Sequence, residues 1–106
     1  MSDVPVDVTV MCRDREEAAE ISKLLVEQRL AACCNLGQEV LSVYRWEGAV
    51  ETTSEITLHA KTMQRALARL FEAVQRMHSY DVPAITALEI GGTTPEYAAW
   101  LDANLE

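Results

Sequence analysis

The chain has 106 residues, and its 17 acidic side chains against 9 basic ones give a formal net charge of −8 at pH 7. The length fits one domain spanning residues 1–106, and an apolar fraction of 49% with a charged fraction of 25% excludes a disordered chain. The acidic balance argues against nucleic acid and anionic membranes as partners, because both need a basic surface that releases counterions.

The first elements expected along the chain are a strand and a helix. Residues 6–12 alternate, with valines and a cysteine on one face and mostly polar side chains on the other, which is typical of a half-buried strand. Asp14 then offers a helix N-cap, and Glu17 stands three positions later, at the spacing of a capping box. We expect this helix to run to about Leu30.

A long β-hairpin is predicted next. Residues 32–36 and 40–46 have extended character, with Gly37 between them, and residues 49–61 form the return strand. Glu47–Gly48 separates the two runs by the two residues of a tight hairpin turn. The hairpin is long for a small domain, so we expect its tip to extend beyond the core, which favours a partner subunit.

The second half of the chain predicts helix, strand and helix. Thr62 is a candidate cap for a helix with an apolar stripe that ends near Met77. Residues 84–90 are apolar on both faces, which indicates a strand that is central or covered, by the last helix or by a second subunit. Thr94 followed by Pro95 predicts the start of a short C-terminal helix.

The element order is therefore βαββαβ with a C-terminal helix. Right-handed crossovers and the adjacency of consecutive elements make this an α+β, ferredoxin-like (split βαβ) sandwich, with one antiparallel sheet and two helices on one face.

A cytoplasmic location is predicted from what the sequence lacks. The start of the chain has no basic segment followed by a long apolar run, so it does not look like a signal peptide. No apolar stretch approaches the roughly 20 residues that span a bilayer. The three cysteines are an odd number, with Cys33 and Cys34 adjacent, which is not the pattern of a disulfide framework.

Four stretches together resemble the CutA divalent-cation tolerance family. They are "LVEQRLAACCN" at residues 25–35, "SVYRWEGAVETTSEITLHAKT" at 42–62, "MHSYDVPAI" at 77–85 and "GTTPEYAAWLDANL" at 92–105. The resemblance covers nearly the whole chain, in order and without large insertions. It implies a homotrimer, similar in architecture to the PII signalling proteins, in which hairpins and sheet edges join the subunits. It also implies a role in tolerance of copper or other divalent metals.

The residues themselves contain no enzyme motif. A nucleophile elbow, a phosphate loop and a dinucleotide fingerprint are all missing from the sequence, which predicts that the protein is not an enzyme.

Copper or a similar divalent cation is the predicted ligand. Thiolate and imidazole suit such ions, but no closely spaced pair of them occurs, so any site must be assembled by tertiary or quaternary contact. The resemblance points to Cys12 and His78, and Cys33 is a third candidate. The alternative is that both cysteines are small buried apolar residues and that His78 caps a helix.

A small-ligand cleft and a subunit interface are also predicted. Lys61, Tyr80 and Asp81 combine charged and aromatic groups of the kind that line clefts, although solvated ends of elements would look the same. In the trimer that the resemblance implies, such groups would come from two subunits. Tyr44 and Trp46 are expected at the trimer interface, where large aromatic side chains supply buried area. The alternatives to a metal-binding or signalling protein are a PII-like sensor of an anionic metabolite or nucleotide, and a purely structural trimer that docks partners.

Overall fold

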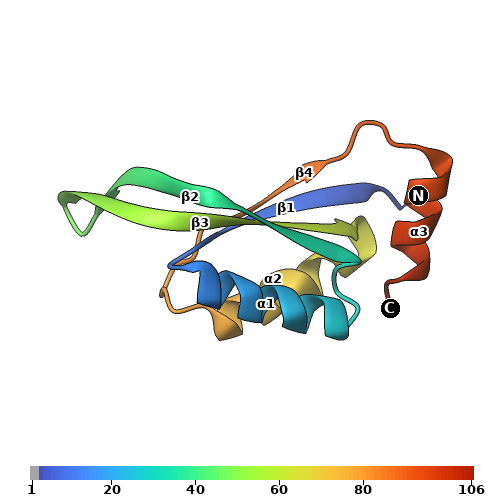
Figure 1. Ribbon diagram of the computed structural model, residues 1–106, viewed down its shortest axis with the longest axis horizontal. Helices are drawn as coiled ribbons and strands as arrows, with labels where there is room; N and C mark the ends of the chain where they lie inside the picture. Colours follow the sequence, from blue (N-terminus) through green and yellow to red (C-terminus); the bar gives the residue numbers. More distant parts are fainter. Residues whose placement is uncertain (1–2) are drawn as a thin grey trace.

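A four-stranded antiparallel sheet in the order β2-β3-β1-β4 runs through the computed structural model, which describes residues 3–106 (Figure 1). Met1 and Ser2 lie outside the described residues. They belong to the predicted domain of residues 1–106 and to the start of the chain, which was predicted not to be a signal peptide. The elements are β1 (Pro5–Cys12), α1 (Arg15–Glu27), β2 (Cys33–Trp46), β3 (Ala49–Met63), a 3-10 turn (Gln64–Ala66), α2 (Leu67–Met77), β4 (Ile85–Glu89) and α3 (Pro95–Ala103).

The ferredoxin-like sandwich is confirmed. Both α1 and α2 cover the same face of the sheet, and α3 stands at one end of it (Figure 1). The alternation of β1 directs Val8, Val10 and Cys12 into the core, where each is completely buried. They pack in one cluster with residues of the two helices such as Leu25 and Leu70, so the apolar stripes of the helices are matched to one face of the sheet.

The hairpin forms where the sequence predicts it. Glu47 and Gly48 both have positive φ, 49° and 84°, as a two-residue type I′ turn requires. The expected interruption at Gly37 is a shift of register between Leu36 and Glu39. A Cβ atom at Gly37 would clash with the Thr57 hydroxyl, so a larger residue there would force that side chain to move.

The outer half of the hairpin projects past the rest of the sheet. Strand β1 ends at its pair with Ile56, so residues 40–54 have no third strand beside them. The molecule is correspondingly elongated, 45 × 26 × 24 Å. Leu41, Val43 and Val50 share one face of this segment and are 69%, 64% and 63% exposed, an unusual concentration of apolar surface.

The prediction that residues 84–90 form a central strand, or one covered by the last helix, is wrong, whereas cover by a second subunit stays a prediction. Strand β4 is an edge strand that pairs with β1 alone, and Leu88 is 73% exposed. Helix α3 does not cover it, because Leu101 and Leu105 pack on Ala32 and Met63 at the end of the sheet. Apolar composition reports how much surface a strand must bury, but not its position in the sheet.

Thr62 is not the cap of the second helix. Strand β3 continues through it to Met63, and α2 begins after the 3-10 turn without a side-chain cap. The alternation of β3 places Thr62 on the core face, where it is completely buried and its hydroxyl donates to the Leu30 carbonyl at 2.7 Å. The end of α1 is also earlier than expected, at Glu27, because Arg29 adopts a positive φ of 58°.

Replacing Thr62 with valine tests that buried hydrogen bond. We expect Thr62→Val to lower the free energy of unfolding by about 1–2 kcal/mol, because the Leu30 carbonyl then has no donor in the core. Urea unfolding at equal protein concentration measures the change. The exposed Thr52 on the same strand is the control, and a similar loss in Thr52→Val would attribute the effect to the strand rather than to the hydrogen bond.

Candidate functional site

Three buried side chains of different chemistry meet where β1 ends, α1 begins and α2 ends. Cys12, Glu17 and His78 each offer one potential ligand atom, and these atoms lie within 4.8 Å of one another. No other group of three or more Cys, His, Asp or Glu side chains meets this criterion between residues 3 and 106. We call these three residues the Cys12 cluster. The structure therefore brings the predicted Cys12 and His78 together and adds Glu17.

Glu17 joins the start of α1 to the segment after α2. Its backbone N–H donates to the N-cap side chain of Asp14 at 2.9 Å, as the capping spacing predicts. Its carboxylate accepts from the backbone N–H of Arg13 at 2.8 Å and of Ser79 at 2.9 Å. Burial raises the pKa of Glu17, but these donors and nearby His78 outweigh burial and hold the pKa below its ordinary value.

His78 is the C-cap residue of α2, and both of its ring nitrogens have partners. Its Nε2 lies 2.7 Å from the Met11 carbonyl oxygen, and its Nδ1 accepts from the backbone N–H of Tyr80 at 3.1 Å. A carbonyl can only accept, so we assign the proton of the ring to Nε2. The Glu17 carboxylate lies 3.7 Å from the same nitrogen. A metal ion on either nitrogen would replace one of these hydrogen bonds.

The thiol of Cys12 is completely buried at this site. Burial, with a smaller contribution from the Glu17 carboxylate, raises the pKa of Cys12 to about 12. The side chain is therefore a protonated thiol at neutral pH. A metal that binds it as thiolate must displace that proton, so ion binding at this site is coupled to proton release.

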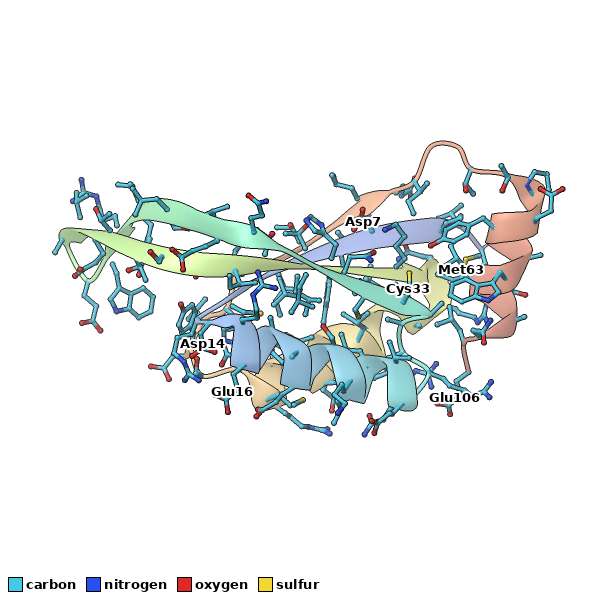
Figure 2. All side chains as sticks on the ribbon, viewed as in Figure 1. Asp7, Asp14, Glu16, Cys33, Met63 and Glu106 are labelled. Atoms are coloured by element: carbon cyan, nitrogen blue, oxygen red, sulfur yellow. The ribbon has the colours of Figure 1, made fainter. Side chains whose placement is uncertain are left out.

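Cys33 does not join the cluster. It pairs with Lys61 on β3, whereas Cys12 pairs with Ile56, a separation of roughly 16 Å along the strand at the usual rise per residue. Figure 2 shows Cys33 near Met63, at the opposite end of the sheet from Asp14 and the start of α1. Its sulfur lies 3.3 Å from the hydroxyl of Tyr97.

A cavity of about 520 Å³ lies beside the Cys12 cluster, between the projecting hairpin and the loop that follows α2. Three aromatic side chains, Tyr44, Trp46 and Tyr80, and two carboxylates, Glu55 and Asp81, line it together with smaller residues. The Tyr80 hydroxyl donates to Oε2 of Glu55 at 3.1 Å. The ring centroids of Tyr80 and His78 are 4.7 Å apart, so the cavity and the cluster are neighbours.

The structure brings Tyr80 and Asp81 of the predicted cleft into this cavity, but not Lys61. The Lys61 side chain lies at the far end of β3, where its Nζ is 3.5 Å from Oδ1 of Asn35. Tyr44 and Trp46, predicted at a subunit interface, line the cavity and remain 41% and 43% exposed.

Two acidic residues of this region are missed by the sequence analysis. The position of Glu17, one helical turn after the end of a strand, could have suggested that it lies near Cys12. Helix capping alone also explains that position, so the spacing did not single Glu17 out. Glu55 is 7% exposed and carries no local signal, since it stands in an ordinary β-compatible run.

None of the helices within residues 3–106 combines the length and the apolar character needed to cross a membrane.

Comparison with protein families gives one consistent result. The family model described as "CutA1 divalent ion tolerance protein" matches residues 6–104. A "Divalent-cation tolerance protein CutA" of Thermus thermophilus is 42% identical over 97 residues, which are 92% of this chain and 94% of that protein. "Protein CutA, chloroplastic" of Arabidopsis thaliana is 42% identical over 94 residues, and the match covers 89% of this chain and 52% of the plant protein. The chain thus spans about half the length of that relative.

Solved structures of similar proteins share the whole fold. The divalent cation tolerance protein of Thermus thermophilus superposes with a TM-score of 0.93 at 40% identity, covering 96% of this chain and 99% of that one. A protein of Archaeoglobus fulgidus, described as a periplasmic divalent cation tolerance protein CutA, gives a TM-score of 0.92 at 33% identity with the same coverage. The printed names place relatives in the periplasm and the chloroplast, so compartment varies among them.

Proposed function

Because this chain belongs to the CutA1 divalent ion tolerance family, we propose that it binds copper or a similar divalent cation at Cys12, Glu17 and His78. The observation that carries the proposal is the meeting of a sulfur, an oxygen and a nitrogen donor within 4.8 Å in the interior. Such a mixed set suits copper and zinc better than calcium or magnesium, which take oxygen ligands. Three protein donors also leave a coordination position for a further ligand.

Binding at this site has a clear cost. The ion must displace the Cys12 proton, whose pKa is about 12, and one of the two hydrogen bonds of the His78 ring. Both requirements weaken binding, and the first makes it depend on pH. A weak, pH-dependent site fits a protein that responds to an excess of metal rather than one that retains a structural ion.

Calorimetric titration of copper(II) into the full chain without oxygen tests the site, with redox-inactive zinc(II) alongside. We expect the combination of Cys12→Ser and His78→Ala to weaken binding about hundredfold or more, because two of three ligands are lost. The wild-type affinity should rise about tenfold per pH unit between pH 6 and 8, because one thiol proton is released.

Cys34→Ser is the matched control for this titration. Burial also raises the pKa of the Cys34 thiol, to about 11, but this residue is outside the Cys12 cluster. Its replacement should leave the affinity unchanged, and Cys33→Ser should do the same. An unchanged affinity in the double variant would remove Cys12 and His78 from the site, and a wild-type chain that binds neither ion would refute the proposal.

The proposed working form is a non-enzymatic homotrimer in the cytoplasm. The apolar face of the hairpin formed by Leu41, Val43 and Val50 supports association, since side chains so exposed in one chain are typical of an interface. Tyr44 and Trp46, on the opposite face of the same hairpin, are proposed at a subunit contact of their own. Three chains of charge −8 would give an assembly of −24, a field that concentrates cations near the surface.

A role as a PII-like sensor of an anionic metabolite has less support than the proposed binding of a divalent cation. Within one chain the cavity is lined by Glu55 and Asp81 and by no lysine, arginine or histidine, which opposes binding of an anion. A purely structural trimer remains the alternative if neither metal nor a small ligand changes the melting temperature, since a ligand of the native state raises it by mass action.

A further inference from the structure

We propose that ion binding at the Cys12 cluster changes the position of the projecting hairpin, residues 40–54, relative to the rest of the sheet. Each of the three segments that supply the cluster also contacts the base of this hairpin, and this observation carries the inference. The inference rests on the proposed function, because it assigns a regulatory effect to the same site. Since the hairpin carries the proposed subunit contact, the ion would act on that contact as well.

The base of the hairpin is an irregular point in the sheet. The register of β2 and β3 shifts there, because Gly37 and Gln38 stand opposite Thr57 alone. This arrangement is a β-bulge, which interrupts the ladder of hydrogen bonds and bends the strand. Strand β1 ends at its pair with Ile56, so among the described residues the hairpin beyond the bulge has no third strand beside it. The bulge is therefore the point at which the hairpin can turn.

The His78 ring is connected to this base through both of its nitrogens. Its Nε2 donates to the Met11 carbonyl at 2.7 Å, and Met11 pairs with Thr57 opposite the bulge. Its Nδ1 accepts from the backbone N–H of Tyr80, whose hydroxyl donates to Glu55 at 3.1 Å. Both hydrogen bonds of the ring therefore lead to β3 at the base of the hairpin.

Helix α1 makes a third connection, to the other strand of the hairpin. The helix carries Glu17, and its first residue, Arg15, donates from Nη2 to the Gly37 carbonyl in the bulge at 2.9 Å. The Glu17 carboxylate also accepts from the backbone N–H of Ser79, which is next to His78. A movement of Glu17 toward an ion would therefore reach β2 through α1 and β3 through the segment after α2.

An ion cannot bind at the cluster without disturbing these connections. Nε2 cannot donate a proton to the Met11 carbonyl and also hold a metal ion, and Nδ1 cannot both accept from Tyr80 and hold one. The three ligand atoms lie within 4.8 Å of one another, and zinc is held at about 2.0–2.3 Å from its ligands, so they would draw closer around it. Binding therefore alters at least one contact at the hairpin base, and the bulge allows the hairpin to turn in response.

Zinc titration followed by the amide NMR signals of the full chain tests the inference. The chain carries Val43→Lys, so that association of the exposed hairpin does not contribute. We expect the signals of residues 40–54 to shift in proportion to the zinc bound, because the hairpin moves with its base. The signals of α3, at the opposite end of the sheet, should stay in place (Figure 1).

Tyr80→Phe is the decisive variant. Phenylalanine keeps the backbone N–H and the ring beside His78 but removes the hydroxyl that reaches Glu55. We expect zinc affinity to stay within about threefold, and the shifts of the hairpin signals to fall by about half, because one of the two connections to β3 is lost. Tyr97→Phe removes a hydroxyl beside Cys33 at the far end of the sheet, and this matched control should change neither quantity.

Three results would overturn the inference and leave the metal site intact. They are hairpin signals that stay in place while zinc binds, shifts in Tyr80→Phe equal to those of the parent chain, and shifts of α3 as large as those of the hairpin. A chain that binds no zinc would also overturn it, whereas the proposed function fails only if copper is not bound either.

Discussion

Glu17→Ala is expected to lower the free energy of unfolding by about 3 kcal/mol at pH 7, because two hydrogen bonds to a buried carboxylate are lost. The backbone N–H groups of Arg13 and Ser79 would both lose their acceptor. One lies before α1 and the other after α2, so the variant also loosens the contact that holds His78 beside Cys12. Urea unfolding monitored by circular dichroism, at equal protein concentration, measures the difference.

The pH dependence of this effect has a definite sign. The pKa of Glu17 is below its ordinary value in the folded chain, so its ionisation stabilises the fold above the unfolded pKa of about 4.3. That contribution is lost as pH falls through the lower folded pKa. The difference between wild type and Glu17→Ala should therefore be constant near neutral pH and shrink below about pH 4.5.

Glu16→Ala is the matched control for Glu17. Glu16 is exposed in the same first turn of α1, so it shares the helix position but not the buried contacts. We expect its replacement to cost less than about 1 kcal/mol, the usual size of an interaction with the helix dipole. Equal losses in the two variants would show that Glu17 acts through the helix terminus alone, and would contradict a role in joining α1 to the segment after α2.

Val43→Lys is expected to convert the proposed trimer into monomers at micromolar concentration. Val43 is 64% exposed on the projecting hairpin, so a lysine there is harmless to the isolated chain. In an assembly that buries this face, each interface would hold an unpaired ammonium group at a cost of several kcal/mol. Light scattering at several concentrations measures the mass, and the wild type should give three times the mass of one chain.

Val26→Lys is the control for the assembly experiment. Val26 is 41% exposed on α1, away from the hairpin, and the substitution makes the same change of charge. It should leave the mass unchanged. A monomeric wild type would refute the trimer, and a Val43→Lys variant that keeps the wild-type mass would show that this face of the hairpin is not the interface.

The parts of the candidate site differ in how far the sequence could predict them. Cys12 and His78 were paired through resemblance to a family, because their residue types alone allow both a ligand and a structural role. Glu17 was predicted only as part of a capping pattern, which the structure confirms, and not as a neighbour of Cys12 and His78. Within one chain, Cys33 and Lys61 lie at the other end of the sheet from the residues with which they were grouped. A site that combines them would need a second subunit, so these two assignments stay predictions.

The sequence alone determined the elements of this protein. The alternation of residues 6–12, the Asp14 cap and the positive-φ turn at Glu47–Gly48 are local, since each follows from dihedral preferences and burial within a few residues. Order and patterning then led to the ferredoxin-like sandwich, because few topologies join such elements without left-handed crossovers.

The tertiary structure alone decided which distant residues meet. Glu17 and the backbone of Ser79 are 62 positions apart, and their contact depends on where α1 starts relative to the end of α2. The strand order placed β4 at an edge, and the register of β3 separated Lys61 from the cavity that Glu55 lines. Local sequence patterns determine how each segment folds. The distances between residues of different segments depend on packing and strand register, which the sequence of one segment does not determine.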